Sequence, residues 1–133
     1  MVKKKRSIHE TATAVIVDDV TSDEEEQVFA DLCRNLAEIR KEKAVVGYIV
    51  RNATSATIDL KEPEKLVEYA ILSSQVLDSN QEVSDLFELG DVQSILLEGK
   101  EIKALCMVID ENKIGIFMEK DADHADILKR VSP

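Results

Sequence analysis

Apolar positions between residues 22 and 42 follow a helical period. They recur at spacings of three, one, three and three, which places side chains on one face of an α-helix, and they are Phe29, Leu32, Cys33, Leu36 and Ile39. Ser22 is followed three positions later by Glu25, which matches a capping box at a helix start. The pattern predicts an amphipathic helix from about Ser22 to about Glu42.

Two short segments after this helix have the pattern of strands. Val45–Val50 is an apolar run, and residues 56–60 alternate between apolar and polar side chains, as in a strand with one buried face. The connection near Asn52-Ala53 predicts a hairpin between them.

A second helical pattern extends from about Glu62 to about Leu89. Pro63 suits the first turn of a helix, and Gly90 is a natural stop at the other end. The expected inward stripe consists of Leu66, Val67, Ala70, Ile71, Ser74 and Leu77, and it resumes at Val83, Leu86, Phe87 and Leu89.

Three further strands are predicted at Val92–Glu98, Glu101–Ile109 and Lys113–Glu119, with turns at Gly99-Lys100 and Glu111-Asn112. The middle strand of the three is apolar on both faces, which indicates a central strand covered by helices on both sides. A short final helix is expected to start near Asp121 or Asp123, with Ala125, Leu128 and Val131 on its apolar face.

The predicted order is helix, two strands, helix, three strands, helix. It indicates an α/β (α+β) three-layer sandwich, in which a five-stranded, mostly antiparallel sheet lies between helices on its two faces. We expect residues 22–131 to form this domain and residues 1–21 to be a leader that is partly disordered or supplies an extra strand. Thr11–Val17 is rich in β-branched residues, so it is either an added edge strand or a docking peptide.

This order resembles the roadblock / dynein light-chain family, with its roadblock/profilin-like sandwich, over about Asp31 to Val131. The segments that carry the resemblance are Val45–Val50, Phe87–Gly90, Ser94–Lys100 and Met107–Ile116. Members of the family usually have a glycine in the first hairpin, whereas residues 51–54 contain none. Asparagine, which is present at position 52, also accepts unusual turn geometry.

The resemblance implies a homodimer in which the third strand pairs with its symmetry mate and the long helices pack together. Carried over to this chain, the interface residues are Ala70, Ile71, Ser74, Leu77, Val92, Ser94, Ile95 and Leu96. The composition of the third strand also favours a dimer, since an apolar strand at a sheet edge tends to be paired or covered. The alternative is that the second helix buries its stripe on its own sheet.

Composition narrows the function classes. The net charge is −10, and without Lys3, Lys4, Lys5 and Arg6 the remaining 13 basic and 27 acidic residues give −14, which repels nucleic acid. No apolar run is long enough for a membrane span or a secretory signal. The two cysteines, Cys33 and Cys106, lie in apolar segments, as expected for reduced thiols of a cytoplasmic protein.

The sequence shows little chemistry of its own. Its four glycines cannot build a phosphate loop, and the acids of Asp121–Asp126 around His124 fit a helix start better than a metal site. We therefore expect no catalytic, cofactor-binding or metal-binding residues and no cofactor. The acidic run from Asp18 to Glu26 is either a solvated helix start or a docking surface for a basic partner. Arg34, Arg40 and Arg51 are more typical of solvent-facing charges than of residues acting on a partner's nucleotide.

The resemblance implies a non-enzymatic scaffold or regulator that binds a small Ras-like GTPase or a larger complex. Two alternatives stay open at this point. One is a domain that senses a small molecule, which needs a cavity with convergent polar groups. The other is a purely structural subunit of a complex, which is indifferent to the nucleotide state of any partner.

Overall fold

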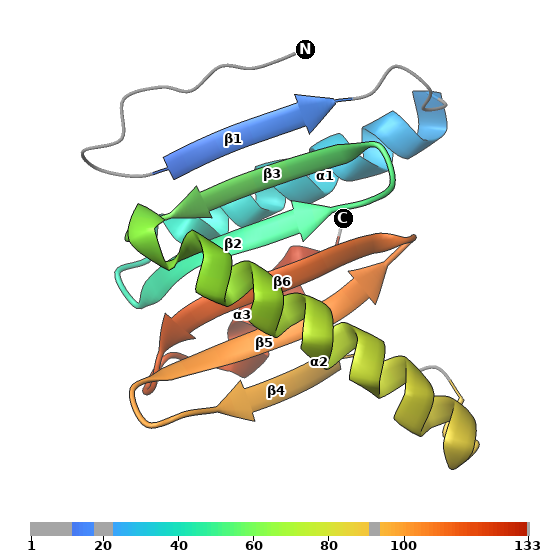
Figure 1. Cartoon of the computed structure of the whole chain (residues 1–133). Coiled ribbons are helices and arrows are strands. Elements are labelled where there is room, and N and C mark those ends of the chain that lie inside the picture. The colour runs from blue at the N-terminus through green and yellow to red at the C-terminus, as the bar shows by residue number, and fades with distance from the viewer. Residues whose placement is uncertain (1–11, 18–22, 91–93, 133) are drawn as a thin grey trace.

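The computed structural model describes residues 12–17, 23–90 and 94–132. Within these ranges, three α-helices, a 3₁₀ turn and six strands follow one another (Figure 1). Their bounds are β1 Ala12–Val17, α1 Asp23–Arg40, β2 Val45–Arg51, β3 Ser55–Leu60, η1 Pro63–Lys65, α2 Leu66–Leu86, β4 Ser94–Glu98, β5 Ile102–Ile109, β6 Asn112–Glu119 and α3 His124–Val131.

The strands form one sheet in the order β1-β3-β2-β6-β5-β4, and every neighbouring pair is antiparallel. The five strands predicted after residue 44 are present. A sixth, β1, pairs along the whole of β3, from Ala12 opposite Leu60 to Val17 opposite Ser55. As a result β1 and β4 are the two edges of the sheet, and β5 lies one strand in from an edge.

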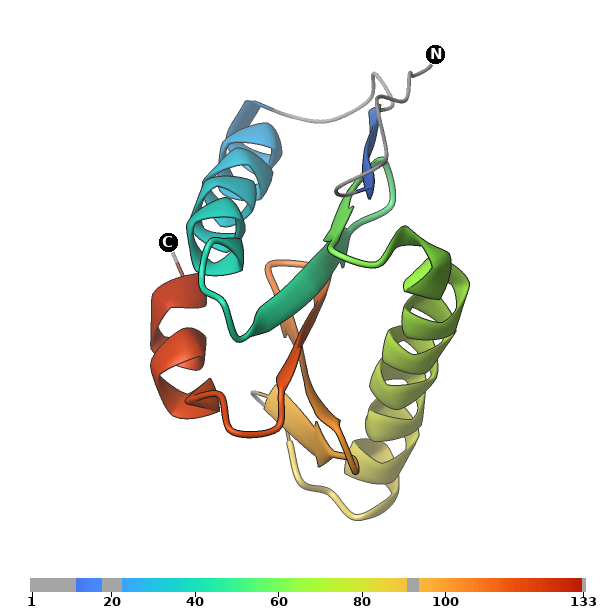
Figure 2. The same ribbon diagram turned by 90° about the vertical axis from the view of Figure 1, so that its left-hand side faces the viewer.

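Helices cover both faces of the sheet, as the sequence pattern predicts. Figure 2 shows α1 and α3 side by side on one face and α2 alone on the other. The single sheet is the middle layer between the helices, so this is the predicted three-layer sandwich. Since α1 and α3 cover more of their face than one helix can, the two faces differ in how completely they are buried.

All three hairpins have two-residue turns, each one position later or earlier than the sequence suggested. Register places Ala53-Thr54, Lys100-Glu101 and Asp110-Glu111 at the tips. Asp110 and Glu111 both have positive φ, 48° and 68°, which is the conformation of a type I′ turn. In the first hairpin the Asn52 carboxamide oxygen accepts the backbone N–H groups of Thr54 and Ser55. The asparagine therefore shapes the turn that lacks glycine.

The first hydrophobic core lies between α1, α3 and the sheet. Leu32, Leu36 and Ile39, three residues of the predicted stripe, are buried there. They meet side chains that alternate along the central strands, namely Tyr48, Val50, Leu105, Met107, Ile114, Ile116 and Met118. Ile127 and Val131 anchor α3 in the same core. The N-cap residue of α3 is Asp123, whose side chain accepts the backbone N–H of Asp126.

The second core lies under α2 and is smaller. Tyr69 stacks on Phe117 with ring centroids 4.3 Å apart, and Leu77 packs against the same group of strand residues. The helix comes close to β6 at Gly115, where an added Cβ would lie 3.0 Å from the Ser73 Cβ. A side chain at Gly115 would therefore push α2 away from the sheet.

The inward stripe predicted for the second helix is only partly correct. Leu66, Ala70 and Leu77 pack toward the sheet, but Val67 and Ile71 are exposed. The face that packs inward is rotated so that Tyr69 and Ser73 are buried instead. Hydrophobic spacing does not distinguish these two overlapping stripes, because each is mostly apolar with a serine in the middle.

The end of α2 also differs from expectation. The helix stops at Leu86, and Glu88, with φ of 54°, takes the left-handed conformation that ends it, two residues before Gly90, whose φ is 77°. The N–H of Leu89 then bonds the carbonyl of Ser84 at 3.0 Å, which is the Schellman arrangement. Among the described residues, no helix has both the length and the hydropathy that crossing a membrane requires.

A pair of phenylalanines tests this account of the core. Phe117 is fully buried, whereas Phe87 is 66% exposed beyond the end of α2. Replacing Phe117 by alanine should lower the free energy of unfolding by about 3–5 kcal/mol. The same change at Phe87 should alter it by less than about 0.5 kcal/mol in the monomer. Urea denaturation of both variants measures the difference, and equal losses would contradict the assigned burial.

Candidate interaction surface

Large apolar side chains that remain exposed are concentrated on one part of the molecule. In the described ranges, all of them belong to α2, the segment just after it, β4 or β5, and none belongs to α1 or α3. They are Val67, Ile71, Val83, Leu86, Phe87, Leu89, Leu97 and Val108. Scattered exposed apolar residues are ordinary on protein surfaces, but a group confined to one side indicates an interaction site. We call the group on α2 and its C-terminal extension the α2 ridge.

The first half of the α2 ridge is formed by Val67 and Ile71. These two residues are four positions apart, so they lie one above the other on the helix surface. Val67 is 68% exposed and Ile71 is 52% exposed. Both point away from the sheet that buries the opposite side of the helix.

The second half of the ridge lies where α2 runs past the sheet. Figure 1 shows the last turns of the helix extending beyond β4, so that no strand lies beneath them. Leu86, Phe87 and Leu89 are exposed there. This position explains why the predicted inward stripe fails from Val83 onward, since the sheet ends before the helix does.

The edge strand β4 adjoins this end of the helix. It pairs with β5 on one side only, from Ser94 opposite Met107 to Glu98 opposite Lys103. Its other side presents backbone N–H and C=O groups that are not paired within the sheet. Glu98, at its end, is its one charged residue, and β4 contains neither proline nor a bulge, so it has few of the features that protect an edge from pairing.

The predicted interface residues fall into three groups in the structure. Ile71 is exposed, and five others are half-buried, namely Ala70, Ser74, Ser94, Ile95 and Leu96. Leu77 is buried against the sheet of its own chain. For that one residue the structure favours the alternative in which the second helix buries its stripe on its own sheet. Val92 lies outside the described residues. Sequence reasoning missed Val67 and Leu86 as exposed residues, because their helical spacing equals that of core residues.

Ser74 is held in place by a strand residue. The Arg51 guanidinium donates a hydrogen bond to the Ser74 hydroxyl at 2.7 Å. The other two arginines singled out in the sequence also have partners within the chain: Arg34 lies 2.8 Å from the Asp31 carboxylate, and Arg40 lies 3.3 Å from that of Asp59. Arg40 and Arg51 are therefore engaged with neighbouring elements and are not typical solvent-facing charges.

A polar cluster between α1 and the sheet contrasts with the apolar ridge. Arg40 and Asp59 face each other across the helix–strand boundary, without the geometry of a hydrogen bond. Burial and the nearby Asp59 carboxylate raise the pKa of Tyr48, which lies in the adjacent strand. The phenol is therefore neutral, and the cluster joins α1 to β2 and β3.

The groups suited to covalent chemistry lie apart from one another. The Cys33 thiol donates to the Thr57 hydroxyl at 3.5 Å, under α1. Cys106 is buried in the core under α2. His124 lies instead beside the buried Lys103, with Nζ and Nδ1 3.1 Å apart. Neither cysteine is thus paired with this histidine as a nucleophile and base would be, and His9 lies outside the described residues.

Two open clefts lie at opposite ends of the sheet. One of about 810 Å³ is lined by residues of the β2, β3, β5 and β6 ends, and the other, about 640 Å³, lies between the start of α1 and the tips of two hairpins. Charged residues form most of the first lining and nearly half of the second. Enclosed apolar cavities are what small-molecule sensors use, and neither cleft has that character.

Comparison with solved structures identifies the architecture. A crystal structure of a Roadblock/LC7 domain from Streptomyces avermitilis superposes with a TM-score of 0.62, over 74% of this chain and 86% of that chain, at 12% sequence identity. The chain has the roadblock/LC7 fold. No protein-family model and no curated protein sequence matches it. The fold resemblance inferred from the order of strands and helices is therefore confirmed in three dimensions.

Thiol reactivity tests the placement of the two cysteines. Burial raises the pKa of the Cys106 thiol to about 11 and also raises that of Cys33. Because the thiolate is the reactive form, both should resist alkylation at pH 8 in the native roadblock/LC7 fold, Cys106 more than Cys33. Mass spectrometry after iodoacetamide treatment, with and without urea, measures this. Rapid native labelling of Cys106 would contradict its burial in the α2 core.

Proposed function

We propose that this protein is a non-enzymatic homodimeric scaffold that regulates a small Ras-like GTPase or holds it in a larger complex. The observation that carries the proposal is the α2 ridge beside an open β4 edge. Exposed apolar surface next to an unpaired strand favours association with another protein chain. The roadblock/LC7 fold supports a regulatory or scaffolding role.

Dimerisation accounts for the β4 edge. Two copies related by a two-fold axis would pair their β4 strands antiparallel and continue one sheet through both subunits, with the same surface used on each. In that arrangement the end of α2, which extends past β4, reaches over the partner. Leu86 and Phe87 would then be covered instead of exposed to water.

The outer face of α2 remains for a further partner. Val67 and Ile71 lie on the half of α2 that crosses the sheet of its own chain, and not on the end that extends past β4. The partner we propose is a GTPase whose contact depends on its nucleotide. The protein itself supplies no nucleotide site in this scheme, and its two free cysteines suit a reducing cytoplasmic location.

Sedimentation of the purified chain tests the dimer. The wild-type protein should sediment as two copies, and Leu86→Glu should weaken the dimer by roughly 30-fold or more, because burying an unpaired carboxylate at an apolar contact costs about 2 kcal/mol or more. Ala37→Glu, on the exposed face of α1, is the matched control and should leave the dimer unchanged. A wild-type monomer at high concentration would contradict the dimer.

Affinity capture tests the partner. The tagged chain is incubated with native lysate containing either GDP or a non-hydrolysable GTP analogue. We expect a small GTPase to be retained more strongly in one state, and Val67→Asp to reduce the retention while Ala37→Glu does not. If the same proteins are retained in both states, with no GTPase among them, the regulator proposal fails and a structural subunit remains.

A further inference from the structure

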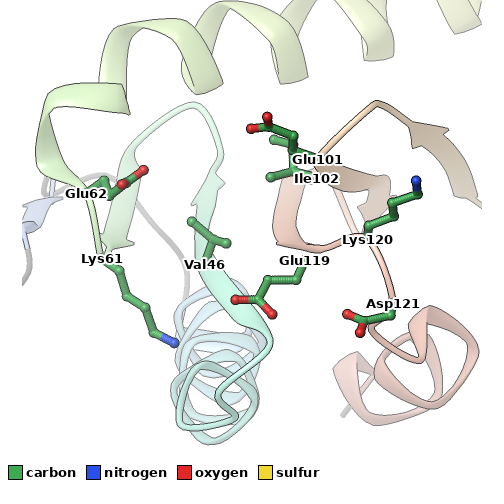
Figure 3. A pocket seen from close by; sticks show the side chains of 8 residues that line it. All are labelled: Val46, Lys61, Glu62, Glu101, Ile102, Glu119, Lys120 and Asp121. Carbon is green, nitrogen blue, oxygen red and sulfur yellow. The ribbon is translucent and has the colours of Figure 1, made fainter.

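The cleft of about 810 Å³ lies at the end of the sheet opposite the first hairpin tip. Figure 3 shows its side chains on the two sides of an opening beneath the start of α2. Val46 and Ile102, both half-buried, give it an apolar floor. The remaining lining residues are charged, namely Lys61, Glu62, Glu101, Glu119, Lys120 and Asp121.

Negative charge predominates around this cleft, with four carboxylates against two lysines. In the described part of the chain, none of these four carboxylates has a lysine or arginine within ion-pair distance. Lys61 extends elsewhere, since its ammonium group donates to the backbone carbonyls of Glu42 and Lys43. The carboxylates at the rim are therefore available to an external cation.

An apolar floor with a carboxylate rim suits a particular kind of ligand. Lysine and arginine side chains have an aliphatic stem and a charged end, and they bury the stem while the charge reaches a polar rim. The cleft thus fits a basic peptide segment better than an acidic or a purely apolar one.

The chain itself carries such a segment on the correct side. Ala12, the first residue of β1, lies opposite Leu60, and Lys61 and Glu62 of the cleft come directly after Leu60. The leader therefore enters the sheet at the same end as the cleft. Lys3–Arg6 is its basic run, and residues 1–11 lie outside the described part of the structure.

The length of the leader is sufficient for contact. The residues of the basic run lie six to nine positions before Ala12, which gives a maximum reach of about 20–30 Å. From β1 to β5 the sheet spans four strand spacings, about 19 Å. The cleft at this end is the nearer of the two, because reaching the other acidic cleft adds a full strand length along the sheet.

We propose that the basic run Lys3–Arg6 of this chain's own leader docks in this acidic cleft. Exposed ion pairs are individually weak, but the tether gives the leader an effective concentration on the order of millimolar. An interaction too weak to persist between separate molecules is therefore populated within one chain. The docked leader occupies the cleft until a competing basic segment or high salt displaces it.

Zero-length carbodiimide cross-linking of the full-length chain tests this proposal. The reagent joins lysine amines to carboxylates in direct contact, and mass spectrometry locates the links. An equal mixture of ¹⁴N- and ¹⁵N-labelled protein separates links within one molecule from links between two. We expect Lys3, Lys4 or Lys5 to be joined to Glu119 or Asp121 within one molecule, with a yield that falls about fivefold or more at high salt.

Two charge-reversal variants give the matched comparison. Glu62→Lys with Glu101→Lys reverses the charge of the proposed cleft, and should abolish the links to Glu119 and Asp121. Glu24→Lys with Glu111→Lys makes the same change in net charge at the other acidic cleft and should leave those links intact. Links spread equally over both clefts, or none at the first, would overturn the proposal. Links mainly between ¹⁴N and ¹⁵N chains would also overturn it, in favour of a second copy's leader.

Discussion

β6 carries a hydrophobic core on each of its faces, and the positions of the three helices follow from those two cores. Ile114, Ile116 and Met118 support α1 and α3, while Phe117 supports α2. Gly115 allows α2 to lie close above this strand. Since the strand is buried on both sides, its backbone must be fully paired, and it is paired with β2 on one side and β5 on the other. The antiparallel sheet is therefore the frame on which the sandwich depends.

The unequal cover of the two faces explains where the exposed apolar residues lie. α1 and α3 together enclose one core, whereas α2 crosses the other face alone. A single diagonal helix must leave part of its own circumference and part of the sheet uncovered. The apolar residues at those uncovered places are the α2 ridge and the β4 edge, which the proposed dimer uses.

Much of the fold was predictable from the sequence, because strand alternation and helical spacing reflect burial directly. All five strands after residue 44 and both helix-covered faces follow from such patterns. The facing of α2 did not follow, because Val67 and Ile71 share the apolar character of the residues that do pack inward. The helix end was also misjudged, since Glu88 adopts a conformation that glycine usually takes. For the same reason the pattern does not distinguish which of the predicted interface residues are exposed.

The pairing of β2 with β6 has a consequence for how the chain folds. Each of the hairpins β2–β3 and β5–β6 joins neighbours in sequence and is able to form early. The contact between the hairpins, by contrast, closes a loop that contains β3, α2, β4 and β5. Contacts between distant parts of a sequence slow folding, because chain entropy is lost before they form. Pairing of β2 with β6 is thus the folding step at which the two halves of the chain first become one cooperative unit.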